Sequence, residues 1–234
     1  SPSSLRPFGL LSGAYFASIG LFNPYAPLWF QHLGYSAFMI GVMGSLQSWT
    51  RIATPYAWGW LGDHWGHGAH RSRLLRIASV IAFFAACLMV AEPSSGLMMA
   101  VVLLLFVGNA AIVPTSETLL AQHLATDRGL DVGRYGRVRV WGSLGFLLAV
   151  MSSGVVLQAI GVAWFAWLMV GMSLLLCAAA FRLPPALPYA PPTAAQPVAR
   201  INQVLRRPEV AWFFASIFFT VLAHTSLYVY LSLY

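Results

Sequence analysis

Seven long apolar runs dominate this chain and limit what it can fold into. Each run has about the 20 residues that a helix needs to cross a bilayer. The runs occupy residues 8–31, 38–61, 74–91, 96–119, 138–160, 164–181 and 210–234. They predict an all-α integral membrane protein whose main surrounding is the lipid bilayer.

Charged residues are scarce in this sequence. They make up 8% of the 234 residues, against about 25% in a typical soluble domain. So few charges cannot cover a soluble surface, which excludes a soluble enzyme, a nucleic-acid binder and a disordered chain. The net charge of +7 comes without a dense basic stretch, so no nucleic-acid partner is expected. Cys87 and Cys177 lie in apolar runs and are expected to act as small hydrophobic residues.

The linkers divide the chain into three parts. Short polar linkers separate the first six runs, so residues 1–182 are predicted to form a six-helix transmembrane bundle. Residues 183–209 are rich in Pro and Ala, which is typical of an extended connector. Residues 210–234 are predicted to form one further helix.

The distribution of arginine predicts the orientation. Arginines precede the first run and follow the second, fourth and sixth runs, whereas the other linkers contain none. Positive residues accumulate on the cytoplasmic side of membrane proteins. We therefore expect a cytoplasmic N-terminus and a cytoplasmic central linker, in the plasma (bacterial inner) membrane.

A charge at membrane depth persists where it is paired or faces a water-filled cavity. Arg51 lies twelve residues before Asp63, about 18 Å along a helix, and therefore near the midplane. Glu117 and Arg139 lie on two runs joined by a short loop and are predicted to pair. The pair is either a structural salt bridge or part of a substrate- or proton-linked site, which we favour. His224 is either a packing residue or a second proton-linked group.

Three histidines near the end of the second run raise the question of a metal site. His64, His67 and His70 recur at a spacing of three, beside Asp63. The glycines around them, Gly62, Gly66 and Gly68, make a helix unfavourable there, so we expect a polar loop. No metal or cofactor is expected.

The same loop resembles the signature loop of the major facilitator superfamily. Gly59, Asp63 and Gly66 match that pattern, and His64 and His67 stand where basic residues are usual. The resemblance implies that the loop braces the cytoplasmic gate of a transporter. Here Gly59 permits close helix packing, Gly66 permits a tight turn, and Asp63 is available to pair with an Arg.

Further stretches resemble the branch of proton symporters that contains the lactose and phenylpropionate permeases. They are residues 20–29, 51–59, 114–117, 135–146 and 224–234. The resemblance implies that Glu117 and Arg139 contact the substrate. Phe146 stands where the branch uses a Trp that stacks on sugar, and Ser143 belongs to the same stretch. The superfamily has two six-helix bundles, with the binding site at the midplane between them.

These observations predict a proton-coupled symporter of a small organic solute. Arg51 and Arg139 supply positive charge, which suits an organic anion with an apolar body, such as an aromatic acid. A sugar or a nucleoside is the alternative substrate. Glu117 and His224 are the candidate proton carriers, and the proton is the coupling ion. The expected ring contacts are Tyr25, Trp29, Phe146 and Tyr228.

We expect the chain to be a fragment that does not transport alone, because it holds one bundle, the linker and one helix of a second bundle. It starts without Met and ends within an apolar run, so the missing C-terminal bundle is its expected partner. The main alternative is a non-transporting membrane scaffold or a half-carrier. An intramembrane serine protease using Ser153 and His224 is less favoured, because Met151 replaces the expected glycine. A retinal pump is excluded because the chain has no Lys. We expect no enzymatic activity.

Overall fold

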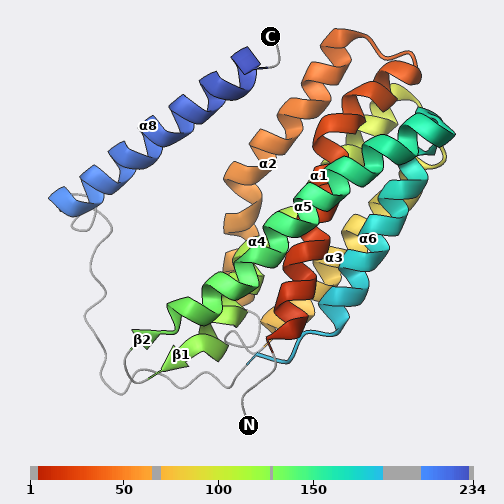
Figure 1. Cartoon of the computed structure of the whole chain (residues 1–234). Helices are drawn as coiled ribbons and strands as arrows, with labels where there is room; N and C mark the ends of the chain where they lie inside the picture. Colours follow the sequence, from red (N-terminus) through yellow and green to blue (C-terminus); the bar gives the residue numbers. More distant parts are fainter. Residues whose placement is uncertain (1–4, 65–69, 127–128, 187–206, 232–234) are drawn as a thin grey trace. The chain divides into compact units, whose positions relative to one another are not determined.

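The computed structural model describes residues 5–64, 70–126, 129–186 and 207–231 (Figure 1). The chain divides into two compact units, residues 1–189 and residues 190–234, and each is described by itself. Helices dominate both units, so the predicted all-α membrane fold is confirmed.

Among the residues that the structure describes, the first unit contains six long helices and the second contains one. The elements are α1 (Arg6–His32), α2 (Ala37–His64), α3 (Arg71–Met89), α4 (Ser95–Leu124), β1 (Ala125–Thr126), β2 (Gly129–Leu130), α5 (Val132–Ile160), the short 3₁₀ helix η1 (Val162–Trp164), α6 (Phe165–Phe181) and α8 (Pro208–Leu231). Each predicted run therefore corresponds to a helix.

Four stretches in the described part of the chain are long and apolar enough to cross a membrane by length and composition. They are α3, α4, α5 and residues Val162–Phe181. Helices α1 and α2 are as long, with 27 and 28 residues. Helix α2 carries Arg51 and Asp63, and charges of this kind are expected on a helix that faces a polar cavity rather than lipid.

The end of α2 corrects one expectation from the sequence. The helix continues through Gly62 and Asp63 to His64, whereas a loop was expected at His64. Gly62 is buried there, and a side chain on it would lie 3.4 Å from Leu74 of α3. Because that glycine serves helix packing, it does not end the helix. The His64 ring stacks on Trp60 at 4.4 Å, and its Nδ1 lies 2.8 Å from the Trp60 carbonyl oxygen.

A two-stranded antiparallel ribbon, β1 and β2, joins α4 to α5. Asp131 follows this ribbon, and its side chain accepts a hydrogen bond of 3.0 Å from the amide of Arg134. Such a cap satisfies an otherwise unpaired amide at the start of a helix. The hairpin therefore fixes where α5 begins relative to the end of α4.

Helices α1 and α5 approach each other closely through glycines. A Cβ atom on Gly145 would collide with the backbone of Gly13, and one on Gly20 would lie 2.7 Å from the carbonyl oxygen of Phe146. Backbones approach this closely in membrane helices where small residues line the contact. Helices α3 and α4 meet in the same way, because a Cβ on Gly108 would lie 2.7 Å from the Ala78 carbonyl oxygen.

The two ends of the bundle differ in charge. At one end lie the start of α1, the ribbon, the start of α3 and the end of α6 (Figure 1). Arg76 donates a 3.2 Å hydrogen bond to the Leu183 carbonyl there. At the opposite end Tyr35 donates to the Pro93 carbonyl at 3.1 Å. Burial and the nearby Glu92 carboxylate raise the pKa of Tyr35 above its ordinary value. The structure thus places the arginine-bearing linkers that it describes at one end.

The contact between α1 and α5 gives a first testable prediction. Gly145→Ala is expected to destabilise the purified full chain by about 1–3 kcal/mol, because the added methyl group meets backbone that cannot move aside. Thermal unfolding in detergent measures this loss. Gly171→Ala on α6 is the control, because a Cβ there meets nothing within 4 Å and alanine favours a helix. Equal midpoints for the two variants would contradict the close contact.

Candidate functional site

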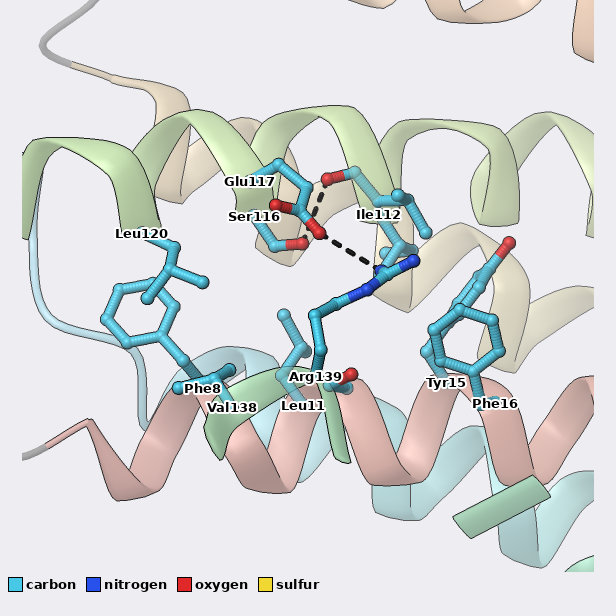
Figure 2. Close-up of a pocket in the computed structure, with 12 residues that line it drawn as sticks. Phe8, Leu11, Tyr15, Phe16, Ile112, Ser116, Glu117, Leu120, Val138 and Arg139 are labelled. Atoms are coloured by element: carbon cyan, nitrogen blue, oxygen red, sulfur yellow. Dashed lines mark hydrogen bonds and ion pairs between the residues drawn. The ribbon is translucent and has the colours of Figure 1, made fainter. Parts of the chain in front are cut away.

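Glu117 of α4 and Arg139 of α5 form an ion pair (Figure 2). The Nη1 atom of Arg139 lies 3.1 Å from Oε1 of Glu117. The two side chains keep 44% and 31% of their surfaces exposed, for Arg139 and Glu117 respectively. The pairing expected from the short loop is therefore confirmed, and the pair is open on one side.

Helix α1 supplies the aromatic group that holds Arg139 in place. The guanidinium carbon of Arg139 lies 5.5 Å from the centre of the Phe16 ring, a distance at which a cation is attracted to a ring face. The close contact of α1 with α5 brings Phe16 under Arg139. One guanidinium therefore joins the carboxylate of α4 to a ring of α1.

The ion pair lies in a narrow pocket between α1, α4 and α5. Its walls include Leu11, Tyr15, Ser116 and Val138, which Figure 2 shows around the two charged side chains. The cavity measures about 20 Å³, which is room for about one water molecule. Ser116 donates a 3.0 Å hydrogen bond to the Val113 carbonyl rather than to Glu117. The pocket can hold the ion pair and water, and it is too small for an organic solute.

A wider hollow opens on the other side of Arg139. It measures about 490 Å³. Its lining residues are Phe16, Ile19, Arg139, Val140, Gly142, Ser143 and Phe146. The structure therefore brings together three residues that the sequence analysis selected, Arg139, Ser143 and Phe146. They recur at one face of α5, with spacings of four and three residues.

Two tyrosines that the sequence analysis did not select belong to this region. The hydroxyl of Tyr135 interacts with both the Glu117 carboxylate and the Arg139 guanidinium. Tyr15 of α1 lines the narrow pocket beside the ion pair. Tyr135 precedes Arg139 by one turn and was detectable from that spacing. Tyr15 gave no comparable signal, because its role depends on how α1 packs.

Arg51 lies on α2 with its side chain exposed. Within the described parts of the chain, no carboxylate pairs with Arg51. It lines neither the narrow pocket nor the hollow beside Arg139. The structure therefore does not bring Arg51 into either pocket that Arg139 lines.

Tyr25 and Trp29 lie away from the ion pair. The Tyr25 hydroxyl donates a 2.8 Å hydrogen bond to the Val150 carbonyl of α5. Trp29 has no exposed surface, and its ring centre lies 5.3 Å from that of Phe165 on α6. Both side chains pack helices together, because the face of α1 that carries them is turned into the bundle.

Several predicted site residues fall outside the described part of the structure. The side chains of His224 and Tyr228 on α8 are among them, as are Gly66 and His67 of the signature loop. Among the residues that the structure describes, no group of three or more His, Cys, Asp or Glu side chains lies close enough to hold a metal ion.

The described part of the signature loop contains a short ion pair. Arg71 Nη2, at the start of α3, lies 2.6 Å from Asp63 Oδ1, at the end of α2. Gly59, one turn earlier, has open space beside it, so it does not serve the close helix packing that the sequence predicts. Asp63 therefore pairs with an Arg, and the pair joins α2 to α3 at the arginine-bearing end.

Comparisons with known proteins agree with this architecture. A search of curated proteins finds the maltose permease of Geobacillus stearothermophilus, 36% identical over 94 residues, which are 38% of this chain and 23% of the permease. A solved structure, that of the nucleoside transporter NupG (D323A mutant), superposes with a TM-score of 0.70 at 19% identity. The superposition covers 92% of this chain and 52% of that chain. The chain thus spans about half the length of NupG.

A family model also matches nearly the whole chain. The model is described as the MFS_1 like family, and it matches residues 11–234. The bundle of α1 to α6, the solved structure that it resembles and this model agree. The chain therefore belongs to the MFS_1 like family, within the major facilitator superfamily of transporters.

Proposed function

We propose that this chain supplies the first bundle of a proton-coupled symporter for a small organic solute, with an aromatic or other organic acid as the favoured substrate. One observation carries the proposal. Arg139 borders both the pocket that holds Glu117 and the hollow of about 490 Å³. The same cation can therefore pair with a protein carboxylate or with a substrate carboxylate.

The competition for Arg139 supplies a mechanism for coupling. An ionised Glu117 occupies the guanidinium at 3.1 Å. When Glu117 takes up a proton it becomes neutral, and Arg139 is then free to bind an organic anion through parallel hydrogen bonds. One proton and one anion enter together, so the charge within the site does not change. Release of the anion lets Glu117 lose its proton and pair with Arg139 again.

The walls of the hollow favour a substrate with an apolar ring. Phe16 and Phe146 line it, while Ser143 offers a hydroxyl group. Aromatic rings attract one another beyond the effect of buried area alone, by about 0.5–1.5 kcal/mol. The second bundle, which we propose as the partner of this chain, would close the open side of the hollow.

Substitution of the charged pair tests the proposed mechanism. In the full-length protein, Glu117→Gln imitates the protonated carboxyl group, so it is expected to keep exchange of labelled substrate across the membrane. It is expected to lose accumulation driven by a proton gradient. Arg139→Gln is expected to lower both activities by about 10- to 100-fold, because it removes a charge-assisted contact. Uptake into vesicles with and without an imposed gradient measures the two activities.

Arg73→Gln is the matched control for Arg139→Gln, because Arg73 is an exposed cation at the start of α3 that lines none of the pockets around the ion pair. Membrane insertion is checked for every variant. Unchanged accumulation by Glu117→Gln would contradict the coupling mechanism. The non-transporting scaffold predicts that none of these variants affects uptake.

The ring of Phe146 gives a separate prediction on substrate class. Phe146→Ala is expected to raise the KM for an aromatic acid about two- to tenfold, from the loss of one ring contact, with little change for an aliphatic acid. The control is Phe84→Ala, because Phe84 is an exposed phenylalanine on α3. No residue of α3 lines the hollow. An equal change for aromatic and aliphatic acids would contradict a ring contact.

A sugar or a nucleoside is the second candidate substrate. Two proteins that the chain resembles are named as a maltose permease and a nucleoside transporter. The Glu117 carboxylate can accept hydrogen bonds from hydroxyl groups, and Phe146 offers an apolar ring. Uptake screens that include both classes beside aromatic acids distinguish the candidates. Transport of a neutral sugar alone would overturn the organic-acid assignment and leave the carrier function in place.

We also propose that the Asp63–Arg71 pair braces the gate at the cytoplasmic end of the bundle, in a bacterial inner membrane. Arg71→Gln is expected to lower the initial rate of uptake several-fold while the affinity for substrate changes little, because the pair lies at the helix ends and away from the hollow. Arg73→Gln is again the control. Initial rates over a range of substrate concentrations provide the measurement, and a change confined to KM would contradict a gating role.

A further inference from the structure

An apolar groove lies on the opposite side of α5 from the proposed solute site. It runs between α1, α5 and α6 and measures about 450 Å³. Its floor is made of small residues, among them Gly13, Ala17 and Gly145, and larger apolar side chains form its rims. The groove is therefore a hollow in the surface of the first unit, separate from the hollow beside Arg139.

The two faces of α5 explain why the groove is not part of the solute site. Arg139, Ser143 and Phe146 line the hollow on one face. The groove is lined from α5 by Trp141, Leu144, Gly145, Leu148, Ala149 and Ser152. On the groove face, side chains such as Leu148 remain highly exposed, at 64%. Exposed apolar side chains without a charge among them are expected to face lipid.

Positive charges gather at one end of this groove. Arg182, at the end of α6, lines the groove itself. Arg6 lies one turn before the lining residue Leu10 on α1, and Arg137 lies one turn before Trp141 on α5. Residues one turn apart share a helix face, so the three cations border one end of the groove. All three side chains are exposed.

Arg6, Arg137 and Arg182 form no ion pair with a carboxylate in the part of the chain that the structure describes. The ion pairs recorded there use Arg71, Arg134 and Arg139. Three like charges around one hollow repel one another unless an anion lies between them. The end that they border is the arginine-bearing end of the bundle, which is expected to face the cytoplasm. Basic pockets between helices on that side bind anionic lipid headgroups.

We propose that the groove between α1, α5 and α6 is a binding site for one anionic phospholipid of the cytoplasmic leaflet. Its phosphate lies among Arg6, Arg137 and Arg182. One acyl chain lies along the small-residue floor, and the Trp141 ring packs at the junction of headgroup and chain, where aromatic rings gather in membrane proteins. This inference does not depend on which solute is transported.

Native mass spectrometry of the full chain tests this proposal. The purified protein is titrated with phosphatidylglycerol and, separately, with phosphatidylcholine of the same acyl chains. We expect a single phosphatidylglycerol to bind more tightly than phosphatidylcholine. Arg182→Gln and Arg137→Gln are each expected to weaken phosphatidylglycerol binding about fivefold, since one basic residue near an anionic surface contributes about 1 kcal/mol.

Two further variants separate the groove from general charge effects. Arg73→Gln removes an exposed cation at the same end on α3 and is expected to leave binding unchanged. Ala178→Trp fills the groove from its exposed wall on α6 and is expected to abolish the single bound lipid, whereas Ala100→Trp, an exposed position on α4 outside the groove, is not. Helicity measured by circular dichroism identifies variants that fail to fold.

Three results would overturn the proposal. Equal binding of the two lipids would show that the arginines do not select an anion. Equal loss in Arg73→Gln and Arg182→Gln would show that net charge alone decides lipid binding. A dimer that Ala178→Trp converts to monomer, with lipid binding unchanged, would assign the groove to a second copy of this chain.

Discussion

The close crossing of α1 and α5 is the contact on which the other features of the first unit depend. Gly13 and Gly145 leave no space between the two backbones. This crossing brings Phe16 to the guanidinium of Arg139 and fixes which face of α5 is turned toward α4. The remaining face of the same helix then forms the wall of the apolar groove. A single helix contact therefore separates the region proposed for solute from the region proposed for lipid.

The ion pair between α4 and α5 gives the bundle a group that can exist in two states. Paired with Glu117, Arg139 is neutralised within the protein, and its hollow presents mainly rings and a hydroxyl group. In the mechanism that we propose, protonation of Glu117 frees the same Arg139 to bind an anion. The partly exposed position of both side chains matters, because a fully buried pair would be closed to water and solute. The coupling that we propose requires no movement of the helices within this bundle, and alternating access would come from rocking against a second bundle.

The sequence alone predicts the helices and the central ion pair. It does not predict which side chains lie at the site where this depends on the direction in which a helix face points. Apolar runs and the positions of arginine depend on length and charge alone, so they predict the seven long helices that the structure describes and the common end of the arginine-bearing linkers of the first unit. The Glu117–Arg139 pair followed because a short hairpin keeps α4 and α5 adjacent. Trp29 and Tyr25 were expected at the site, yet Trp29 packs on Phe165 and Tyr25 bonds to α5, because the rotation of an apolar helix cannot be deduced from a nearly uniform sequence. Tyr15 lines the pocket for the same reason, and the sequence does not indicate it. The sequence also predicts that Gly62 interrupts the helix, because its packing against α3 can be seen only in the folded structure.

The exchange of partners at Arg139 is the central claim, and infrared difference spectroscopy of the full-length protein tests it most directly. Spectra are recorded before and after addition of an aromatic acid, at constant pH. The account predicts that substrate displaces the Glu117 carboxylate and that a band of a protonated carboxyl group appears, which Glu117→Gln lacks. Tight substrate binding without any new protonated carboxyl band, or with the same band in Glu117→Gln, would contradict the account.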